Sequence, residues 1–471
     1  MADVVRYVDE KAQDLVEIAD AVWNYSEVGF SEAKSAKVQA DYLEKQGFKV
    51  TRGAGGVPTA FVAEWGEGRP YIGFLGEYDA LAGVSQEVSA ERKPREEGAP
   101  GHGCGHNLLG TAALGATLAV KGALEEKKVP GTVRYYGCPA EELLAGKVYM
   151  AREGLFSDLD ISITWHPGSM NTVRLSSGTA MNSAKFQFFG KTAHAAGDPH
   201  NGRSALDAVE LMNVGANYLR EHVIKDASIH YVITSGGGQP NVVPAFAEVW
   251  YFVRAPRREQ VEEIYERLVD VAKGAALMTG TTFKIDFLTG CYEVLLNEVL
   301  ADVMWDCLQK VGPPVFDEKD TEFGKRLAET FDKSMVENMR KSPDFQELPE
   351  LKDQVLNTTL VPPRGKGRSG GGSTDVGDVS WIVPTVQMSA ATVPIGCPGH
   401  SWQHCASSGS SIGHKGMLVA AKTMALTALE LIDNPEIIKK AWKEFNEKTK
   451  DSPYECPFPQ GQAFPIERFF N

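Results

Sequence analysis

Hydrophobic positions recur along this chain at helical spacing in some segments and as short, nearly continuous runs in others. Helices are predicted at 9–25, 31–46, 108–125 and from the Glu141-Glu142 pair to about 154. Strands are predicted at 49–51, 59–63, 71–75, 132–137 and 160–164. The run at 71–75 is almost entirely apolar, as in a strand buried on both faces. This alternation predicts an α/β domain in which helices flank a mixed central sheet.

From about residue 178 the pattern changes to that of a smaller, half-exposed sheet. Alternating residues predict a strand at 184–189, and the next segments give the order helix, strand, strand, helix, strand. Their ranges are 204–223, 229–234, 247–253, 259–278 and 282–287. This order is the ferredoxin-like α+β pattern. We therefore expect an inserted domain at 179–291, with 1–178 and 292–471 together forming the larger domain.

The C-terminal part returns to helices around one more apolar strand. Helices are predicted at 297–311, within the charge-rich segment 316–362, at 415–432 and after Asn434-Pro435; the strand is at 385–391. A basic, Gly-rich loop at 364–373 is either a mobile cover for a site or an ordinary linker.

The composition indicates a globular protein and narrows its partners. Of the 471 residues 43% are hydrophobic, and the formal net charge is −14. Nucleic acids and anionic membranes attract basic proteins, so this acidic balance argues against both. The seven cysteines are scattered and odd in number, as expected for reduced thiols, and the first residues form no apolar signal segment. We expect a cytoplasmic protein.

The sequence Cys104-Gly105-His106 places a thiol and an imidazole two residues apart in a Gly- and Pro-rich bend before a helix. A thiolate with an imidazole suits a divalent ion such as zinc. A buried structural cysteine beside a capping histidine is the alternative for this pair alone.

Further polar side chains follow successive predicted strands of the larger domain. They are Glu77, Asp79, Glu141, Glu142, His166 and His400. A site for two metal ions needs about five ligands, one of them bridging, and Cys104, His106, Glu142, His166 and His400 would serve. One glutamate of the pair can stay unligated as the general base, and Asp79 can orient a ligand histidine. Each residue also has an ordinary interpretation, such as acids at a helix N-terminus.

The inserted domain carries its own candidates in two loops. His194 lies among small residues in Gly190-Lys-Thr-Ala-His-Ala-Ala196, where a ligand or a neighbouring subunit can approach it. Asn241 stands between prolines in Gln239-Pro-Asn-Val-Val-Pro244. Ordinary loop polarity is the alternative for both.

Taken together these motifs resemble the aminoacylase/carboxypeptidase-like metallohydrolases, in the amidohydrolase branch with a Cys-Gly-His core, and most of all its aminobenzoyl-glutamate utilisation group. The motifs are Gly76-Glu-Tyr-Asp-Ala-Leu-Ala-Gly83, Gly101-His-Gly-Cys-Gly-His-Asn-Leu-Leu-Gly110, Arg203-Ser-Ala-Leu-Asp-Ala-Val209 and Ser373-Thr-Asp-Val-Gly-Asp-Val-Ser-Trp381. The resemblance runs from the first helix to Cys456-Pro457. Two departures are Leu143-Leu144, where relatives have glycines, and Glu77, where many metallopeptidases have a ligand histidine that this branch lacks.

The resemblance implies a site that binds two divalent ions, zinc or manganese. The implied ligands are Cys104, His106, Glu142, His166 and His400, with Glu141 as the general base. His194 would reach the active site of a partner subunit and stabilise the tetrahedral oxyanion, while Asn241 and Arg254 bind the free carboxylate of the substrate. The expected assembly is a homodimer, or a heterodimer with a related subunit.

The function expected from these features is hydrolysis of the amide in an N-acyl or N-aroyl amino acid with a free carboxylate, such as aminobenzoyl-glutamate. The alternatives are another N-acyl amino acid, such as an indole-acetyl conjugate, or a dipeptide. A further alternative is a subunit that binds a partner and completes its site, although the intact ligands and base argue against it.

Overall fold

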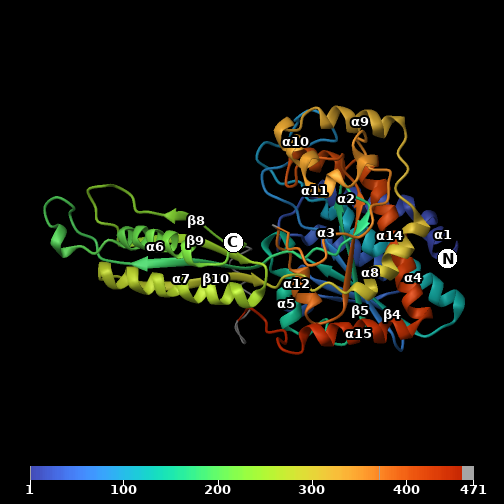
Figure 1. The fold of residues 1–471 in the computed structure, drawn as a ribbon, viewed down its shortest axis with the longest axis horizontal. Coiled ribbons are helices and arrows are strands. Elements are labelled where there is room, and N and C mark those ends of the chain that lie inside the picture. Colours follow the sequence, from blue (N-terminus) through green and yellow to red (C-terminus); the bar gives the residue numbers. More distant parts are fainter. Residues whose placement is uncertain (1, 371, 459–471) are drawn as a thin grey trace. The chain divides into compact units, whose positions relative to one another are not determined.

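The computed structural model describes residues 2–370 and 372–458, which divide into two units (Figure 1). The first unit takes its described residues from Met1–Ser176, Leu295–Arg368 and Val379–Asn471, and the second from Ser177–Val294 and Ser369–Asp378. Residues 369–378, expected in the larger domain, thus group with the smaller one. Gly371 of the predicted Gly-rich loop and the final 459–471 lie outside the described residues.

The first unit is built on a seven-stranded mixed sheet in the order β1-β2-β4-β3-β5-β11-β6. The strands are β1 Lys49–Arg52, β2 Phe61–Glu67, β3 Tyr71–Glu77, β4 Gly131–Cys138, β5 Ile161–Gly168, β6 Thr172–Val173 and β11 Thr385–Ala391. The central four, β4-β3-β5-β11, are parallel, and the outer strands are antiparallel. The mixed sheet flanked by helices is therefore confirmed.

Helices of the larger unit surround this sheet. They are α1 Ala2–Glu10, α2 Ala12–Tyr25, α3 Ala33–Lys45, α4 His106–Lys127, α5 Gly146–Arg152, α8 Glu298–Val311, α9 Glu318–Ala328, α10 Lys333–Lys341, α11 Pro343–Gln346, α13 Trp402–Ser408, α14 Ser411–Asp433 and α15 Pro435–Thr449. The short helix α12, Val376–Ser380, crosses the boundary between the units. Helices α1 and α13 were not predicted. Among the residues of α1 whose burial is described, Val4 and Val8 are fully buried, a pattern too weak to separate this helix from the next one.

Helix α4 forms the centre of the core of the first unit. It packs against β3, α14, α1 and α2, and its small residues allow close approach: a Cβ on Gly115 would lie 2.8 Å from Leu15 Cδ1. By length and composition this helix is apolar enough to cross a membrane, but 89% of that window is buried inside the protein, as in a core helix. The Trp165 indole of β5 donates to the Leu109 carbonyl of α4 at 3.0 Å, and this side chain is fully buried between the strand and the helix.

The second unit has the β-α-β-β-α-β order that the sequence predicted. Its elements are β7 Ala180–Phe189, α6 Ala205–Leu219, β8 Ser228–Ser235, β9 Phe246–Ala255, α7 Arg258–Thr279 and β10 Thr282–Cys291. The strands lie in the order β10-β7-β9-β8 with every pair antiparallel, and α6 and α7 pack on the same sheet. This is the ferredoxin-like arrangement, with its own hydrophobic core.

Candidate metal centre

The polar residues singled out in the larger domain follow the four parallel strands. Glu77 ends β3 and Asp79 follows it, Glu141 and Glu142 follow β4, His166 lies near the end of β5, and His400 follows β11. Parallel neighbours bring their carboxyl ends to one edge of the sheet, where open α/β sheets place their sites. The sheet topology explains why residues so distant in sequence meet.

The turn before α4 supplies Cys104 and His106 at the same edge. Gly105 has a φ of +81° and precedes His106, the first residue of α4. A Cβ at Gly105 would lie 3.0 Å from the Pro167 side chain and 3.3 Å from His404 Nε2. Both the left-handed backbone and the close approach therefore require glycine here.

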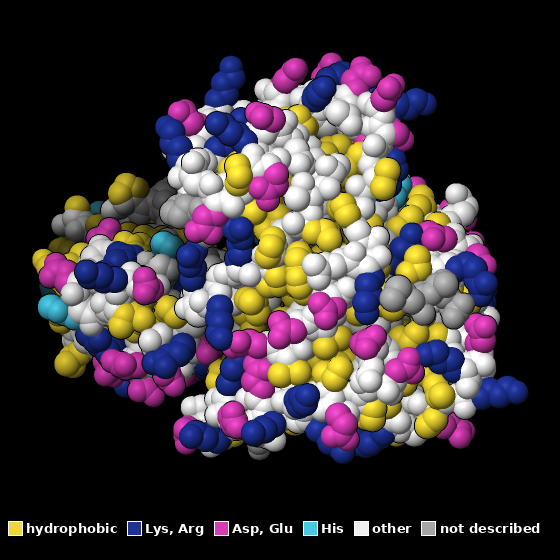
Figure 2. All heavy atoms as spheres, turned by 45° about the vertical axis from the view of Figure 1, so that its right-hand side comes forward, with side chains coloured by type: hydrophobic (Ala, Val, Ile, Leu, Met, Phe, Trp, Pro, Cys, Tyr) yellow, Lys and Arg dark blue, Asp and Glu magenta, His cyan; other side chains and the backbone are white. Residues whose placement is uncertain are grey.

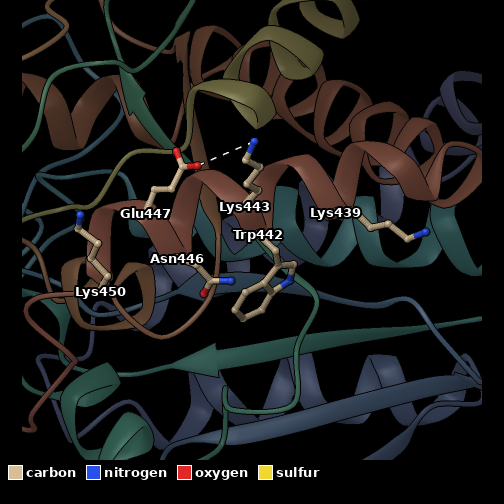
Figure 3. A pocket seen from close by; sticks show the side chains of 6 residues that line it. All are labelled: Lys439, Trp442, Lys443, Asn446, Glu447 and Lys450. Carbon is tan, nitrogen blue, oxygen red and sulfur yellow. Dashed lines mark ion pairs between the residues drawn. The ribbon is translucent and has the colours of Figure 1, made fainter.

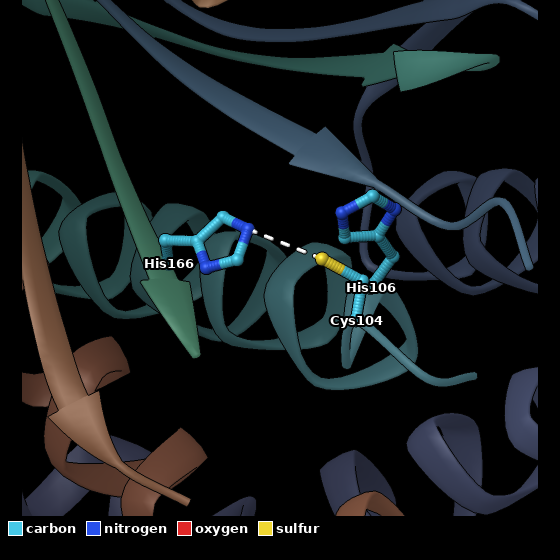
Figure 4. Close-up of side chains that lie close together, drawn as sticks. All are labelled: Cys104, His106 and His166. Atoms are coloured by element: carbon cyan, nitrogen blue, oxygen red, sulfur yellow. Dashed lines mark hydrogen bonds between the residues drawn. The ribbon is translucent and has the colours of Figure 1, made fainter. Parts of the chain in front are cut away.

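Figure 4 shows Cys104, His106 and His166 with their reactive atoms directed toward one another. Cys104 Sγ lies 3.5 Å from His166 Nε2, while His166 Nδ1 lies 2.7 Å from the Pro167 carbonyl. Burial, and then the charge of Arg174, lower the pKa of His166 to about 4. The ring is thus neutral near pH 7 with its proton on Nδ1, which leaves the Nε2 lone pair facing the thiol.

Asp79 connects His106 to the glutamate pair. Its Oδ1 accepts from His106 Nδ1 at 2.8 Å, and its Oδ2 accepts from the backbone N–H of Glu142 at 2.9 Å. Burial opposes ionisation of Asp79, but the neighbouring His106 outweighs it and lowers the pKa of the carboxyl. Asp79 is thus placed to orient His106, as the sequence suggested, rather than to contact a substrate.

The remaining nitrogen of His106, Nε2, is buried and has no hydrogen-bond partner. It lies 3.3 Å from Glu77 Oε2, 3.8 Å from Glu141 Oε2 and 4.0 Å from Glu142 Oε1. The Glu77 and Glu142 oxygens of this set are buried without hydrogen bonds as well. Buried polar atoms are normally satisfied, so this convergence suits a cation.

Glu142 also approaches a second histidine. Its Oε2 lies 3.5 Å from Nε2 of His400, whose side chain is 59% exposed and whose φ is +53°. A left-handed histidine is strained, and such strain clusters at functional sites. Burial raises the pKa of Glu142 and raises that of the Cys104 thiol to about 12, both of which a bound divalent ion would reverse.

The described residues thus contain three groups whose possible ligand atoms lie within 4.8 Å of one another. The groups are Cys104/His106/His166, Cys104/Glu142/His400 and Glu77/His106/Glu141. All five residues expected as ligands are present, and Cys104 belongs to two groups. Sulfur, imidazole and carboxylate donors fit a borderline divalent ion such as zinc, so the residues fit the metal that the sequence suggested.

Several neighbours of this centre gave no usable signal in the sequence. Lys147 Nζ pairs with Glu77 Oε1 at 2.7 Å with both side chains almost fully buried, and Glu32 Oε1 accepts from the Ala140 N–H at 2.8 Å. Burial, then Asp79, raise the pKa of Glu32 to about 8. His404 has a buried Nε2 without a partner. Glu32 is distant in sequence from the other residues of the centre, whereas Lys147 and His404 lie in the helices that follow Glu142 and His400, and their contacts depend on the fold.

The candidates of the second unit lie at two ends of its sheet. The Ala195 N–H donates to the Asn241 carbonyl at 3.0 Å, and His194 is exposed beside Val242. The N–H groups of Ala196 and Gly197 donate to His194 Nδ1, so the proton of the neutral ring is on Nε2. Arg254 lies at the opposite end of β9 and pairs with Met181. His194 and Asn241 are therefore brought together, whereas Arg254 is separate.

Of two hollows in the first unit, the smaller one reaches the edge of this centre at His400. A hollow of about 540 Å³ runs along α15, lined by Lys439, Trp442, Lys443, Asn446, Glu447 and Lys450 (Figure 3), and it contains none of the candidate residues. A smaller pocket of about 210 Å³ includes His400 and Trp402 beside the 83–98 loop. The metal-binding side chains therefore favour the cluster at the strand ends, rather than either hollow, as the functional site.

The chain is similar to known hydrolases over nearly its whole length. A family model for a peptidase dimerisation domain matches residues 164–278. The chain is 42% identical to a subunit of the p-aminobenzoyl-glutamate hydrolase of Escherichia coli, covering 98% of each chain, and 29% identical to Xaa-Arg dipeptidase of Mus musculus, covering 94% of this chain and 91% of that one. It shares the fold of a dinuclear metal-binding M20 peptidase of Bacillus subtilis, with a TM-score of 0.58 and 16% identity, and the match covers 90% of this chain and 99% of that one.

The Gly105 turn gives a first prediction. Gly105→Ala places a Cβ in a left-handed position against Pro167, so we expect the free energy of unfolding to fall by about 1–3 kcal/mol and metal retention to weaken. Denaturant unfolding and metal analysis measure both. Gly399→Ala is the matched control, since nothing lies within 4 Å of its Cβ position beside His400; equal effects in the two variants would contradict the prediction.

Proposed function

The chain belongs to the M20 family of peptidases and amidohydrolases, which includes the p-aminobenzoyl-glutamate hydrolase of Escherichia coli, and we propose that it hydrolyses the amide of N-aroyl or N-acyl amino acids that carry a free carboxylate. The relative named above identifies p-aminobenzoyl-glutamate as the first substrate to test. The observation that carries the proposal is the convergence of five metal-ligand side chains, with Cys104 common to two groups.

The proposed cofactor is a pair of divalent ions, zinc or manganese, held by Cys104, His106, Glu142, His166 and His400. A pair is supported by the two groups that share Cys104. Bound there, the ions would supply the Lewis acidity that lowers the pKa of water and polarises the amide carbonyl.

Glu141 is the proposed general base, and Glu142 is the proposed ligand. Glu142 lies between His106 and His400, and Glu141 Oε2 lies 3.8 Å from His106 Nε2. Glu141 is buried, within a short helical turn flanked by the left-handed residues Ala140 and Leu144, which fixes its direction. In this role Glu141 takes a proton from the attacking water and returns it to the leaving amine.

The positions of the candidates in the second unit support a dimer. About eight residues of extended strand separate the Asn241 loop from Arg254, which is roughly 25 Å. One substrate carboxylate cannot span this distance, so Arg254 and the His194/Asn241 pair of a single chain cannot both contact it. A second copy that supplies His194 and Asn241 resolves the conflict, and the matched dimerisation domain agrees with this arrangement.

A heterodimer is the second assembly to consider, because the Escherichia coli relative is named as one subunit of its hydrolase. A chain that carries its own ligands and base does not need those groups from a different subunit, so the homodimer is the form proposed here.

The proposed location is the cytoplasm, where free thiols such as Cys104 stay reduced. Charges of both signs alternate over the face shown in Figure 2, without a continuous basic patch on that face.

Metal removal tests the role of Cys104. We expect alkylation of Cys104 to be slow in the metal-loaded protein and fast after chelation, because the ligated thiolate is shielded and chelation releases it. Peptide mass spectrometry measures each site separately. Cys456, which is half-buried and outside the centre, is the internal control and should react equally in both states. Equal labelling of Cys104 in the two states would argue against ligation.

The glutamate pair offers a matched set of substitutions. Glu141→Gln should keep the metal content and lower kcat by about two to four orders of magnitude, because the amide cannot accept the proton. Glu142→Gln should instead lose metal. Metal analysis and steady-state kinetics on p-aminobenzoyl-glutamate distinguish the two, and loss of metal in both variants alike would refute the assigned roles.

Subunit exchange tests the composite site. His194→Ala and Glu141→Gln should each be nearly inactive alone, since the oxyanion loses a donor worth about 3–4 kcal/mol in the first and the base is missing in the second. Mixed homodimers should recover about one quarter of wild-type activity, because half the dimers are mixed and each has one intact site of two. Verified exchange without recovery would show that His194 does not act across the interface.

A further inference from the structure

Arg174 is a cation beside the candidate metal centre to which no role has been assigned. It directly follows β6, and its Nη1 donates to Gln387 Oε1 at 3.1 Å while its backbone N–H donates to the Gln387 carbonyl at 2.9 Å. Within residues 2–370 and 372–458 no carboxylate forms an ion pair with its guanidinium. Gln387 therefore holds one donor of the guanidinium and leaves others available.

The sheet places this guanidinium on the same face as His166. In the parallel pair of β5 and β11, Gln387 lies beside Thr164 and Ser389 beside His166. Paired residues and residues two apart share a face, and the strand spacings put the Cα atoms of Gln387 and His166 about 8 Å apart. The other face, with Trp165 and Met388, is packed in the core.

The electrostatics of the cluster agree with this placement. Desolvation lowers the pKa of Arg174, while Cys104 and Glu141 are near enough to oppose that change. The residue is nevertheless exposed to solvent. Its guanidinium therefore stays charged and is within reach of a dissolved anion.

We propose that Arg174, positioned by Gln387, forms a carboxylate-binding subsite that recognises the acidic side chain of the amino acid in the substrate. This inference rests on the proposed function and narrows its substrates to N-aroyl and N-acyl conjugates of glutamate or aspartate. Such conjugates carry two carboxylates. Arg254 and Asn241 are the groups proposed for the α-carboxylate. The planar guanidinium of Arg174 supplies paired N–H donors that can bind both oxygens of the side-chain carboxylate.

The test compares three substrates that differ only in charge: p-aminobenzoyl-glutamate, p-aminobenzoyl-glutamine, and the α-amide of p-aminobenzoyl-glutamate. Arg174→Gln should lower the ratio of kcat/KM for the glutamate conjugate over the glutamine conjugate by about 10- to 100-fold, the range of a hydrogen bond to a charged group. Arg174→Lys should keep part of the preference. Arg364→Gln is the matched control, because Arg364 lies beside Arg174 in a β-bridge but pairs with Glu347, and the ratio should be retained there.

A binding measurement separates recognition from chemistry. In the Glu141→Gln background, calorimetry should show that Arg174→Gln weakens binding of the glutamate conjugate by a similar factor, with the metal content and melting temperature preserved. An unchanged ratio, equal losses on both side-chain forms, or a loss that follows the α-carboxylate instead would each overturn the proposal. If the wild-type protein hydrolysed none of the three, the proposed function would fail, and the comparison of Kd with and without Arg174 would still decide the role of Arg174.

Discussion

The hydrogen bonds of Asp79 are the constraint on which the candidate centre depends. The Asp79 carboxylate accepts hydrogen bonds from the His106 ring and from the backbone N–H of Glu142. It therefore holds the residues after β3, the residues after β4 and the Cys104 turn in fixed positions relative to one another. With Nδ1 of His106 engaged, only Nε2 can face the acidic side chains. A change in the end of β3 would therefore displace a histidine and a glutamate together, although neither is close to Asp79 in sequence.

The packing of helix α4 keeps the Cys104 turn in place. Helix α4 is buried between the sheet and other helices, so the turn at its N-terminus cannot shift without disturbing the core. Small residues in α4 and Gly105 at its start bring backbone and side chains closer than a larger residue would allow. Close packing around these small residues thus holds Cys104 and His106 in rigid positions.

Much of this arrangement could be predicted from the sequence, because local patterns encode it. Alternating strands and helices predicted the mixed sheet, and the position of each polar residue after a strand predicted that they would meet at one edge. The sequence could not reveal Lys147, Glu32 or Arg174, since a lysine in a helix or an arginine after a short strand carries no local sign of its partner. Nor could it show that Asn241 and Arg254 lie at opposite ends of β9, because that depends on strand length and pairing.

The balance of charge explains why these unpredicted cations matter. Glu77, Asp79, Glu141 and Glu142 converge with a thiol around His106, and a cluster of buried acids is unstable without compensation. Lys147 offsets one carboxylate through its ion pair with Glu77. The remaining negative charge faces Cys104, His166 and His400, which is where a pair of divalent ions would be held. Under the proposal made above, Arg174, which has no carboxylate partner among the described residues, offers its charge to an anion from outside, so the centre would have one region for metal and another for substrate.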